Sequence, residues 1–332
     1  MGKNLARACF IIAPCKINLH LSIGERRPDG FHDLESLFVP LAFHDSLYIE
    51  RGGKDGDYSL EINWELPIET MPPVVPSEIP LEKNLVSRAV SLFRERTGFK
   101  NGLFVRLDKR IPVGAGLGGG SSDAASCLLA LNALANDALP LEKLKELALI
   151  LGSDVPFFLN RGADDTVCPS AAFVSGRGDL VEPVKTPRGL WVLLVKPGFS
   201  SDTAGAFQLL DQMRKSSSRE GKISLLALDN SPIDVIKRTL EGAPETWPFY
   251  NDFLPVVLAS GDHQNVDKYR EILAALKDAG ASFAGLSGSG SCCFGVFKVL
   301  ETAEKVEKEF GIHGNFVKLT FFLAQKSIPV LE

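Results

Sequence analysis

The sequence predicts an α+β fold of two domains, and three observations support that prediction. The chain has 332 residues, enough for two domains or one large one, with 45% hydrophobic and 23% charged residues, as in ordinary globular proteins. Strand-like and helix-like segments are mixed, without the regular alternation of a doubly wound sheet. A proline-containing turn at 183–187 separates two sets of such segments. We therefore expect one domain over residues 1–184 and a second over residues 185–332.

The sequence predicts several strands followed by a helix in the first part of the chain. Residues 9–23 form a strand, an interruption at Pro14 and a second strand in which hydrophobic and polar residues alternate. A turn over RRPDGFHD and further strands over 34–50 follow. Residues 84–97 carry the hydrophobic period of a helix, for which Asn84 is a suitable N-cap.

The remaining elements follow from the same rules of period and length. We expect strands at 103–107, 191–198, 291–297 and 316–323, and helices over 121–134 and 141–151. The polar stretch 211–222 is expected to be mobile, and the rest of the second half to be mostly helical up to a glycine–serine turn at 285–290. This mixture is typical of the α+β class.

Charge and cysteine content narrow the class of protein. The net charge is −5, and no dense block of Lys and Arg occurs, which argues against a nucleic-acid partner. No hydrophobic stretch approaches the roughly 18 residues of a membrane span. The six cysteines form no C-x-x-C pair and no zinc spacing, which favours buried, reduced thiols. We expect a cytoplasmic protein with neither a nucleic-acid nor a membrane partner, either monomeric or a homodimer.

The most informative segment is IPVGAGLGGGSSDAAS at 111–126. Five glycines lie between a strand-like and a helix-like run, and glycine lets the backbone approach a ligand closely. The first turn of a helix has free N–H groups and a positive partial charge, so such a loop can hold phosphates. The predicted phosphate-binding residues are Pro112, Val113, Gly114, Ala115, Gly116, Leu117, Gly118, Gly119, Gly120, Ser121 and Ser122.

Three known phosphate loops fit this segment poorly. A Walker A loop needs a lysine after its last glycine, and none is present. The spacing G-x-G-x-x-G is met, but no second strand ends in an acidic residue about 20 residues later, as a Rossmann fold requires. The protein-kinase loop expects an H-R-D segment, which is absent. A glycine-rich turn without a ligand is the plainer alternative.

Residues 112–124, PVGAGLGGGSSDA, resemble the phosphate loop of the GHMP kinase superfamily, whose pattern is P-x-G-x-G-L-G-G-G-S-S-x-A. Further segments resemble the members of the superfamily whose substrate carries a cytidine diphosphate. These segments are APCKINLHLSI, RRPDGFHDLES, LGSDVPFFL, GRGDLVEP, KPGFSSDTAGAF, NDF and GLSGSGSCCF. The resemblance spans most of the chain, and it implies a two-domain GHMP-kinase-like α+β fold with the active site in the cleft between the domains. Cys15, Leu254 and the segment 163–175 depart from the pattern.

The resemblance also implies the chemistry and its cofactors. The chain would transfer the γ-phosphoryl group of ATP, with Mg²⁺, to a hydroxyl of a small molecule that carries a cytidine diphosphate. Asp154 matches the catalytic aspartate, which accepts the hydroxyl proton and contacts the substrate. Lys16 matches the catalytic lysine, which offsets the developing negative charge. No carboxylate cage for the metal is visible, which suits an ion held largely by phosphate oxygens and water.

The substrate and nucleotide contacts follow from the same resemblance. Asn18 would orient the substrate. Phe31 would stack on cytosine and His32 would hydrogen-bond its edge, while Phe199 would close the other side of the base. Asn84 and Leu85 match positions near the adenine pocket. The second glycine loop, Ser287–Gly290, is expected either beside the first loop or as a plain turn between helix and strand.

Plainer alternatives exist for each of these residues. Asp154 is also suited to cap a turn, Lys16 to lie on a solvated strand face, and Phe31 and Phe199 to pack in loops. At the level of function, the alternatives are a GHMP kinase for another alcohol, such as homoserine or a mevalonate derivative, and a non-catalytic nucleotide sensor. The aromatic residues with His32 argue against the first alternative, and the lysine and aspartate argue against the second.

Overall fold

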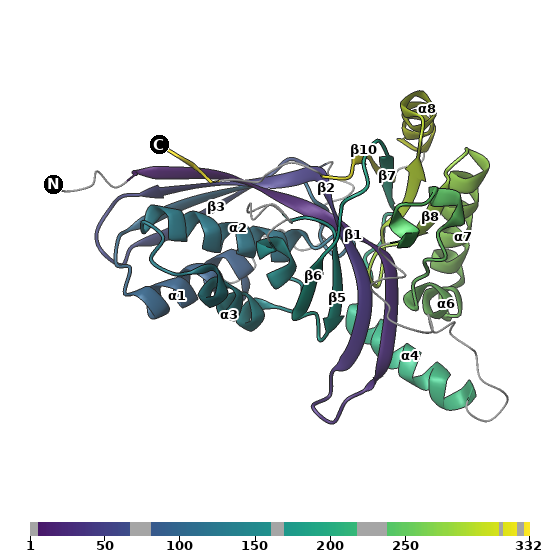
Figure 1. Ribbon diagram of the computed structural model, residues 1–332, viewed down its shortest axis with the longest axis horizontal. Coiled ribbons are helices and arrows are strands. Elements are labelled where there is room, and N and C mark those ends of the chain that lie inside the picture. The colour runs from purple at the N-terminus through teal and green to yellow at the C-terminus, as the bar shows by residue number, and fades with distance from the viewer. Residues whose placement is uncertain (1–5, 67–80, 161–168, 218–237, 312–314, 324–328) are drawn as a thin grey trace.

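The computed structural model describes residues 6–66, 81–160, 169–217, 238–311, 315–323 and 329–332. Two separate β-sheets and the helices packed on them make up these residues, which confirms the predicted α+β class (Figure 1). None of the helices in these ranges is long and hydrophobic enough to cross a membrane.

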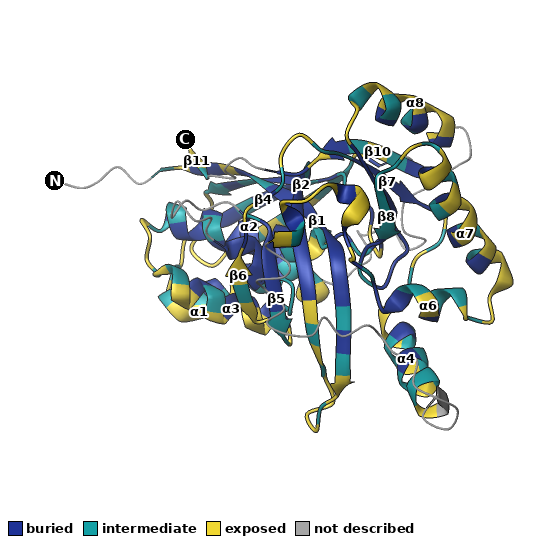
Figure 2. Ribbon diagram, turned by 45° about the vertical axis from the view of Figure 1, so that its right-hand side comes forward, coloured by how far each residue is buried: buried dark blue, intermediate teal, exposed yellow. Residues whose placement is uncertain are grey.

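The first sheet has seven strands in the order β11-β1-β2-β4-β3, with β5 paired to β2 and β6 paired to β5. All its pairings are antiparallel except that of β3 with β4. Its strands are β1 (Ala8–Arg26), β2 (His32–Arg51), β3 (Tyr58–Trp64), β4 (Leu103–Lys109), β5 (Ala172–Gly176), β6 (Leu180–Pro183) and β11 (Val330–Leu331). The hairpin of β1 and β2 extends well beyond the rest of the sheet, and its tip is exposed (Figures 1 and 2).

The helices of the first half cover one face of this sheet (Figure 1). They are η3 (Leu81–Lys83), α1 (Leu85–Thr97), α2 (Gly119–Leu134), α3 (Leu141–Leu151) and η4 (Pro156–Leu159). The predicted N-cap is confirmed, because the Asn84 side chain accepts a hydrogen bond from the Val86 N–H at 2.8 Å. Helix α2 is buried on nearly all sides from Ser122 onward, as its apolar sequence predicts, whereas Gly119, Gly120 and Ser121 of its first turn are only partly covered.

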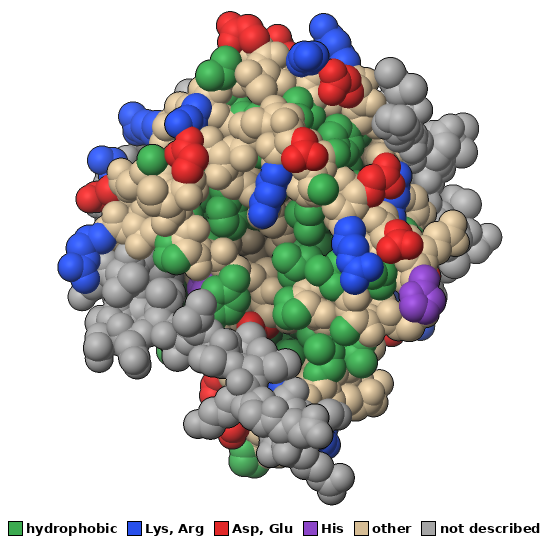
Figure 3. All heavy atoms as spheres, turned by 90° about the vertical axis from the view of Figure 1, so that its right-hand side faces the viewer, with side chains coloured by type: hydrophobic (Ala, Val, Ile, Leu, Met, Phe, Trp, Pro, Cys, Tyr) green, Lys and Arg blue, Asp and Glu red, His purple; other side chains and the backbone are tan. Residues whose placement is uncertain are grey.

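The second sheet is antiparallel, with the order β10-β7-β9-β8. Its strands are β7 (Trp191–Lys196), β8 (Phe283–Leu286), β9 (Cys293–Phe297) and β10 (Phe316–Phe321). The accompanying helices are α4 (Thr203–Ser217), η5 (Pro244–Thr246), α6 (Phe253–Leu258), α7 (His263–Asp278) and α8 (Leu300–Gly311). On the face shown in Figure 3, hydrophobic side chains gather around a central hollow, with acidic and basic side chains interspersed around them.

Two local features differ from what the sequence suggests, for physical reasons that the structure shows. Strand β1 does not stop at Pro14; the register shifts between Pro14 and Lys16, and such a bulge accommodates a proline within a strand. Residues 211–217, expected to be mobile, form the last part of helix α4, because Leu209, Leu210 and Met213 give the helix a face that packs on the core. Residues 218–222 lie outside the described residues.

The described hydrophobic residues form three clusters, and strand β1 contributes to all of them. Cys9 and Ile11 lie in the cluster under α1 and α2, Ile17 in the middle cluster, and Leu21 and Ile23 in the cluster with α6 and α7. The predicted domain boundary at 184–185 falls in the segment that connects β6 of the first sheet to β7 of the second. We keep this division as a proposal, since β11 returns to the first sheet.

Candidate active site

The predicted phosphate loop connects β4 to α2 and adopts a conformation that glycine favours. Gly114, Gly116 and Gly118 have φ angles of 66°, 73° and 70°, in the left-handed region. Helix α2 begins at Gly119, and its N-cap Gly118 provides no side chain to satisfy the free N–H groups. The loop and the first turn of α2 line a cleft of about 400 Å³. This cleft is therefore suited to hold an anion against backbone N–H groups.

Both residues predicted near an adenine pocket line the same cleft. Asn84 and Leu85 lie at the start of α1, opposite the phosphate loop. Ile62 and Trp64 of β3 also line it, and the sequence analysis did not single them out. Their signal was weak, because an aromatic or aliphatic residue in a strand is ordinary until its neighbours in space are known.

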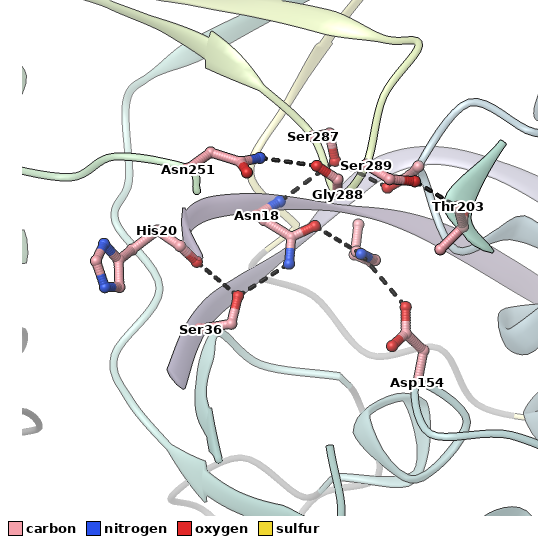
Figure 4. Close-up of polar contacts among 11 residues, drawn as sticks. Asn18, His20, Ser36, Asp154, Thr203, Asn251, Ser287, Gly288 and Ser289 are labelled. Atoms are coloured by element: carbon pink, nitrogen blue, oxygen red, sulfur yellow. Dashed lines mark hydrogen bonds and ion pairs between the residues drawn. The ribbon is translucent and has the colours of Figure 1, made fainter. Parts of the chain in front are cut away.

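Lys16 and Asp154 lie together, as the resemblance implied. The Lys16 Nζ atom lies 3.3 Å from Asp154 Oδ2 and donates a hydrogen bond to Asn18 Oδ1 at 2.7 Å. Figure 4 labels the two partners, Asn18 and Asp154. Lys16 is 3% exposed, whereas the Asp154 side chain is 32% exposed. The Lys16 ammonium group also lies 4.4 Å from the ring centroid of Phe38. Lys16 is thus a buried, positioned cation, and it does not lie on a solvated strand face.

The lysine–aspartate pair adjoins the phosphate loop. The Lys16 N–H donates a hydrogen bond to the Leu117 carbonyl at 2.9 Å. A Cβ atom on Gly118 would lie 3.0 Å from Lys16 Cγ and 3.1 Å from Phe158 Cζ. Only a glycine lets the loop pass this close to the lysine side chain. The site therefore places a cation and a carboxylate directly beside the backbone of the glycine loop.

The second glycine loop packs on the first, which supports the expected neighbour relationship. The Ser287 hydroxyl donates a hydrogen bond to the Gly116 carbonyl at 2.9 Å, and the Asn18 N–H donates to Ser287 Oγ at 3.4 Å. The Asn251 side chain donates to the Leu286 and Gly288 carbonyls at 2.7 and 2.8 Å (Figure 4). The NDF segment thus holds the second loop in place, and that loop holds the first.

Comparisons with known proteins agree with this geometry. Family models for the GHMP kinases N terminal domain and the GHMP kinases C terminal match residues 84–168 and 264–315. The chain is 36% identical over 295 residues to the 4-diphosphocytidyl-2-C-methyl-D-erythritol kinase of Thermodesulfovibrio yellowstonii, covering 89% of this chain and 92% of that one. It is 37% identical over 295 residues to the protein of the same name from Solidesulfovibrio magneticus, covering 87% and 88% of the two chains. The chain belongs to this GHMP kinase family.

Solved structures extend the likeness of this GHMP kinase to three dimensions. A crystal structure of 4-(cytidine 5'-diphospho)-2C-methyl-D-erythritol kinase matches it with a TM-score of 0.68 and 28% identity, covering 94% of this chain and 98% of that one. The homoserine kinase of Cytophaga hutchinsonii matches with a TM-score of 0.64 but only 17% identity, covering 100% and 99% of the two chains, so it shares the fold. The predicted superfamily and its α+β fold are confirmed.

The three residues predicted to hold cytosine lie in two places in the kinase. The Phe31 ring is 48% exposed at the tip of the β1–β2 hairpin. The His32 ring stacks on Phe207, and its Nε2 atom lies 2.9 Å from Asp211 Oδ1. Phe199 contacts the Tyr269 ring edge-on, with 5.2 Å between the centroids. No ring contact between Phe31 and Phe199 occurs in the described structure, so the sandwich stays a prediction for the substrate complex.

The kinase has a buried charge cluster that sequence reasoning missed. Lys109, at the end of β4, forms ion pairs with Asp45 of β2 and with Asp123 of α2, the second at 2.7 Å. Burial alone would lower the pKa of Lys109, but the two carboxylates raise it above its usual value, so the lysine stays charged. Burial raises the pKa of Asp123 well above its usual range. Lys109 and Asp123 both line the cleft beside the glycine loop, so this cluster fixes the base of that loop.

Oxygen atoms suitable for a metal ion lie at the start of α2 in this kinase. The Ser122 hydroxyl and Asp123 Oδ1 are buried without a hydrogen-bond partner. Among the described residues, no group of three or more His, Cys, Asp or Glu side chains is arranged to bind a metal. Hard oxygen donors beside a phosphate loop fit Mg²⁺ that keeps most of its ligands from phosphate and water.

Five cysteines of the described ranges are free and buried, whereas Cys168 lies outside them.

Proposed function

We propose that this chain phosphorylates the 2-hydroxyl of 4-diphosphocytidyl-2-C-methyl-D-erythritol with ATP, giving the 2-phosphate and ADP, in the methylerythritol phosphate route to isoprenoid precursors. The observation that carries the proposal is the Lys16–Asp154 pair beside the phosphate loop, in a chain 36% identical to a relative of that name. Phosphoryl transfer to a hydroxyl uses both a proton acceptor and a cation at this point.

The reaction forms one bond and breaks one bond. The substrate hydroxyl oxygen attacks the γ-phosphorus of ATP, the bond to the bridging oxygen breaks, and ADP leaves with that oxygen. Asp154 accepts the hydroxyl proton; its half-open position lets a hydroxyl reach Oδ1 or Oδ2. Lys16 offsets the charge on the attacking oxygen and on the phosphoryl group, and Asn18 fixes the direction of the ammonium group.

The nucleotide lies in the cleft lined by the glycine loop. Backbone N–H groups of residues 114–121 hold the phosphates, and Asn84 and Leu85 flank the adenine. The hydroxyls of Ser121 and Ser122 would serve as protein donors to Mg²⁺, which would supply charge neutralisation to the phosphates when bound with ATP. Phe31, His32 and Phe199 hold the cytosine of the other substrate. The enzyme acts in the cytoplasm, as a monomer or homodimer, without a nucleic-acid partner.

A coupled ADP-release assay tests this function. Protein is incubated with Mg-ATP and, in separate reactions, 4-diphosphocytidyl-2-C-methyl-D-erythritol, mevalonate or homoserine. We expect ADP release with the cytidine compound alone. ADP release with another alcohol would mean that the chain is a GHMP kinase for that alcohol. No ADP release from protein that still binds ATP would favour a nucleotide sensor.

A further inference from the structure

Arg177 occupies the turn between β5 and β6, and the turn holds it in a defined position. The flanking Gly176 and Gly178 have φ angles of 66° and 100°, values that few other residues adopt. The Arg177 N–H donates a hydrogen bond to Asp179 Oδ1 at 2.8 Å, which closes the turn. The backbone from which this exposed arginine projects is therefore ordered by its own local interactions.

The turn lies between the catalytic pair and the tip of the β1–β2 hairpin. On one side, Gly178 packs so closely on Ser153 that an added Cβ would lie 2.9 Å from the Ser153 carbonyl oxygen, and Asp154 follows directly. On the other side, β5 pairs with β2 so that Gly176 lies opposite Leu34, three residues from Phe31. Arg177 is thus held between the proton acceptor and the expected cytosine platform.

The Arg177 guanidinium group lies 3.7 Å from the centroid of the Phe31 ring. At this distance the planar group packs on one face of the ring and is oriented by it. Phe31 remains 48% exposed, so ring surface is still open to a base. The arginine and the aromatic ring together present a cation and an apolar face at one place.

Arg177 and Arg27 differ in their ionic partners. Arg27 forms ion pairs with Asp29 at 3.1 Å and with Asp33 at 2.7 Å, so its guanidinium group is already engaged by two carboxylates. No carboxylate of the described residues lies within 4.0 Å of Arg177. Arg177 interacts with the Asp29 carboxylate only at longer range, where it helps to lower the pKa of Asp29. The donors of its guanidinium group therefore stay available for an anion beside the active site.

We propose that Arg177 is a substrate-recognition residue that binds the diphosphate of the nucleoside diphosphate substrate. This inference rests on the proposed function, because it takes the cytosine to lie at Phe31 and the reacting hydroxyl at Asp154. The diphosphate joins those two ends of the substrate and must pass between them, where Arg177 lies. The fork of N–H donors matches two phosphate oxygens, which a lysine ammonium group cannot do.

The test compares ligands that differ only in the diphosphate. Dissociation constants of cytidine and of cytidine 5'-diphosphate are measured by calorimetry for the wild type, Arg177→Met and Arg177→Lys. The matched control is Arg106→Met, because Arg106 also lies over an aromatic ring, Tyr48, but on strand β4 away from the turn. Kinase turnover with the full substrate is measured in parallel.

We expect Arg177→Met to weaken cytidine 5'-diphosphate binding by roughly 10- to 100-fold, the range of charged hydrogen bonds, with cytidine binding unchanged. Arg177→Lys should recover only part of the loss, and Arg106→Met should match the wild type. The KM for the cytidine substrate should rise with Arg177→Met while kcat and the KM for ATP stay within about twofold.

Three outcomes would overturn the assignment: unchanged diphosphate affinity in Arg177→Met, equal loss for both ligands, or a wild type that binds neither. Equal loss would mean that the arginine acts by packing on Phe31. The experiment distinguishes a failure of the Arg177 assignment from a failure of the proposed kinase function. Absence of turnover in a wild type that binds cytidine 5'-diphosphate through Arg177 would reject the kinase function and leave this anion contact in place.

Discussion

The ammonium nitrogen of Lys16 lies 3.3 Å from a carboxylate oxygen of Asp154, although the two residues come from different elements. Lys16 lies in the middle of β1, and Asp154 lies just before η4. The lysine is fully enclosed and the aspartate is only partly so. The cation is therefore fixed by its surroundings, while the carboxylate can still meet an incoming hydroxyl.

Replacing Asp154 by Asn should remove the proton acceptor and little else. We expect kcat to fall by roughly 10²- to 10⁴-fold, the usual contribution of a positioned general base. The dissociation constant of ATP should change by less than about threefold, because Asp154 does not line the nucleotide cleft. Turnover by ADP release and ATP titration check this, and near-normal turnover would remove Asp154 from the role of base.

Replacing Gly116 by Ala should disturb the contact between the two glycine loops. The residue has a φ of 73°, and an added Cβ would collide with the Ser287 carbonyl. We expect weaker ATP binding, by at least tenfold, since strain of this kind amounts to about 1–3 kcal/mol. Gly261→Ala is the control, because nothing lies within 4 Å of its Cβ position. Equal ATP affinity in both variants would contradict the predicted cradle.

Replacing Lys109 by Met should leave two buried carboxylates facing each other. Asp45 is fully buried and Asp123 nearly so, and removal of one partner from such a cluster typically lowers the free energy of unfolding by about 3–5 kcal/mol. The double variant Lys109→Met, Asp123→Asn should recover part of the loss. Urea unfolding of both variants measures the difference, and equal stability of the two would argue against charge as the cause.

Protonation of His20 should make stability depend on pH. Burial lowers the pKa of His20 from 6.5 to about 4. Between those pH values His20 binds a proton in the unfolded chain but not in the folded protein. The free energy of unfolding therefore falls as the pH falls. At about 1.4 kcal/mol for each pKa unit, the full effect is at most about 3 kcal/mol.

The check for His20 is urea unfolding at pH 7 and pH 5, with His20→Gln as the variant that cannot titrate. The wild type should lose more stability between these values than the variant does. The same slope in both proteins would show that other groups cause the pH dependence.

Replacing Phe199 by Ala should mainly raise the KM for the cytidine substrate. The ring packs against Tyr269, and by the proposed function one side of it meets the cytosine. We expect an increase of roughly tenfold, in line with a buried aromatic contact of about 1–2 kcal/mol. Steady-state kinetics with each substrate varied in turn measure this. An effect confined to ATP would end the sandwich assignment.

How far the sequence predicts this site depends on how local each signal is. The glycine loop and the cap of Asn84 are local patterns, and both are found where the sequence predicts them. Lys16 and Asp154 were paired by family resemblance, since nothing local says that residues 138 positions apart will meet. The cluster of Lys109 with two aspartates was missed for that reason. Its members come from three elements, and each alone looks like an ordinary surface charge.

The continuity of strand β1 also has a consequence for unfolding. The same strand supplies residues to all three hydrophobic clusters and carries Lys16 between the outer two. Loss of any one cluster would free part of this strand, so the clusters should melt together in one cooperative transition. Activity and tertiary structure should then disappear at the same denaturant concentration. A fragment with only the first sheet would keep β1 but would lose the cluster that Leu21 and Ile23 form with α6 and α7.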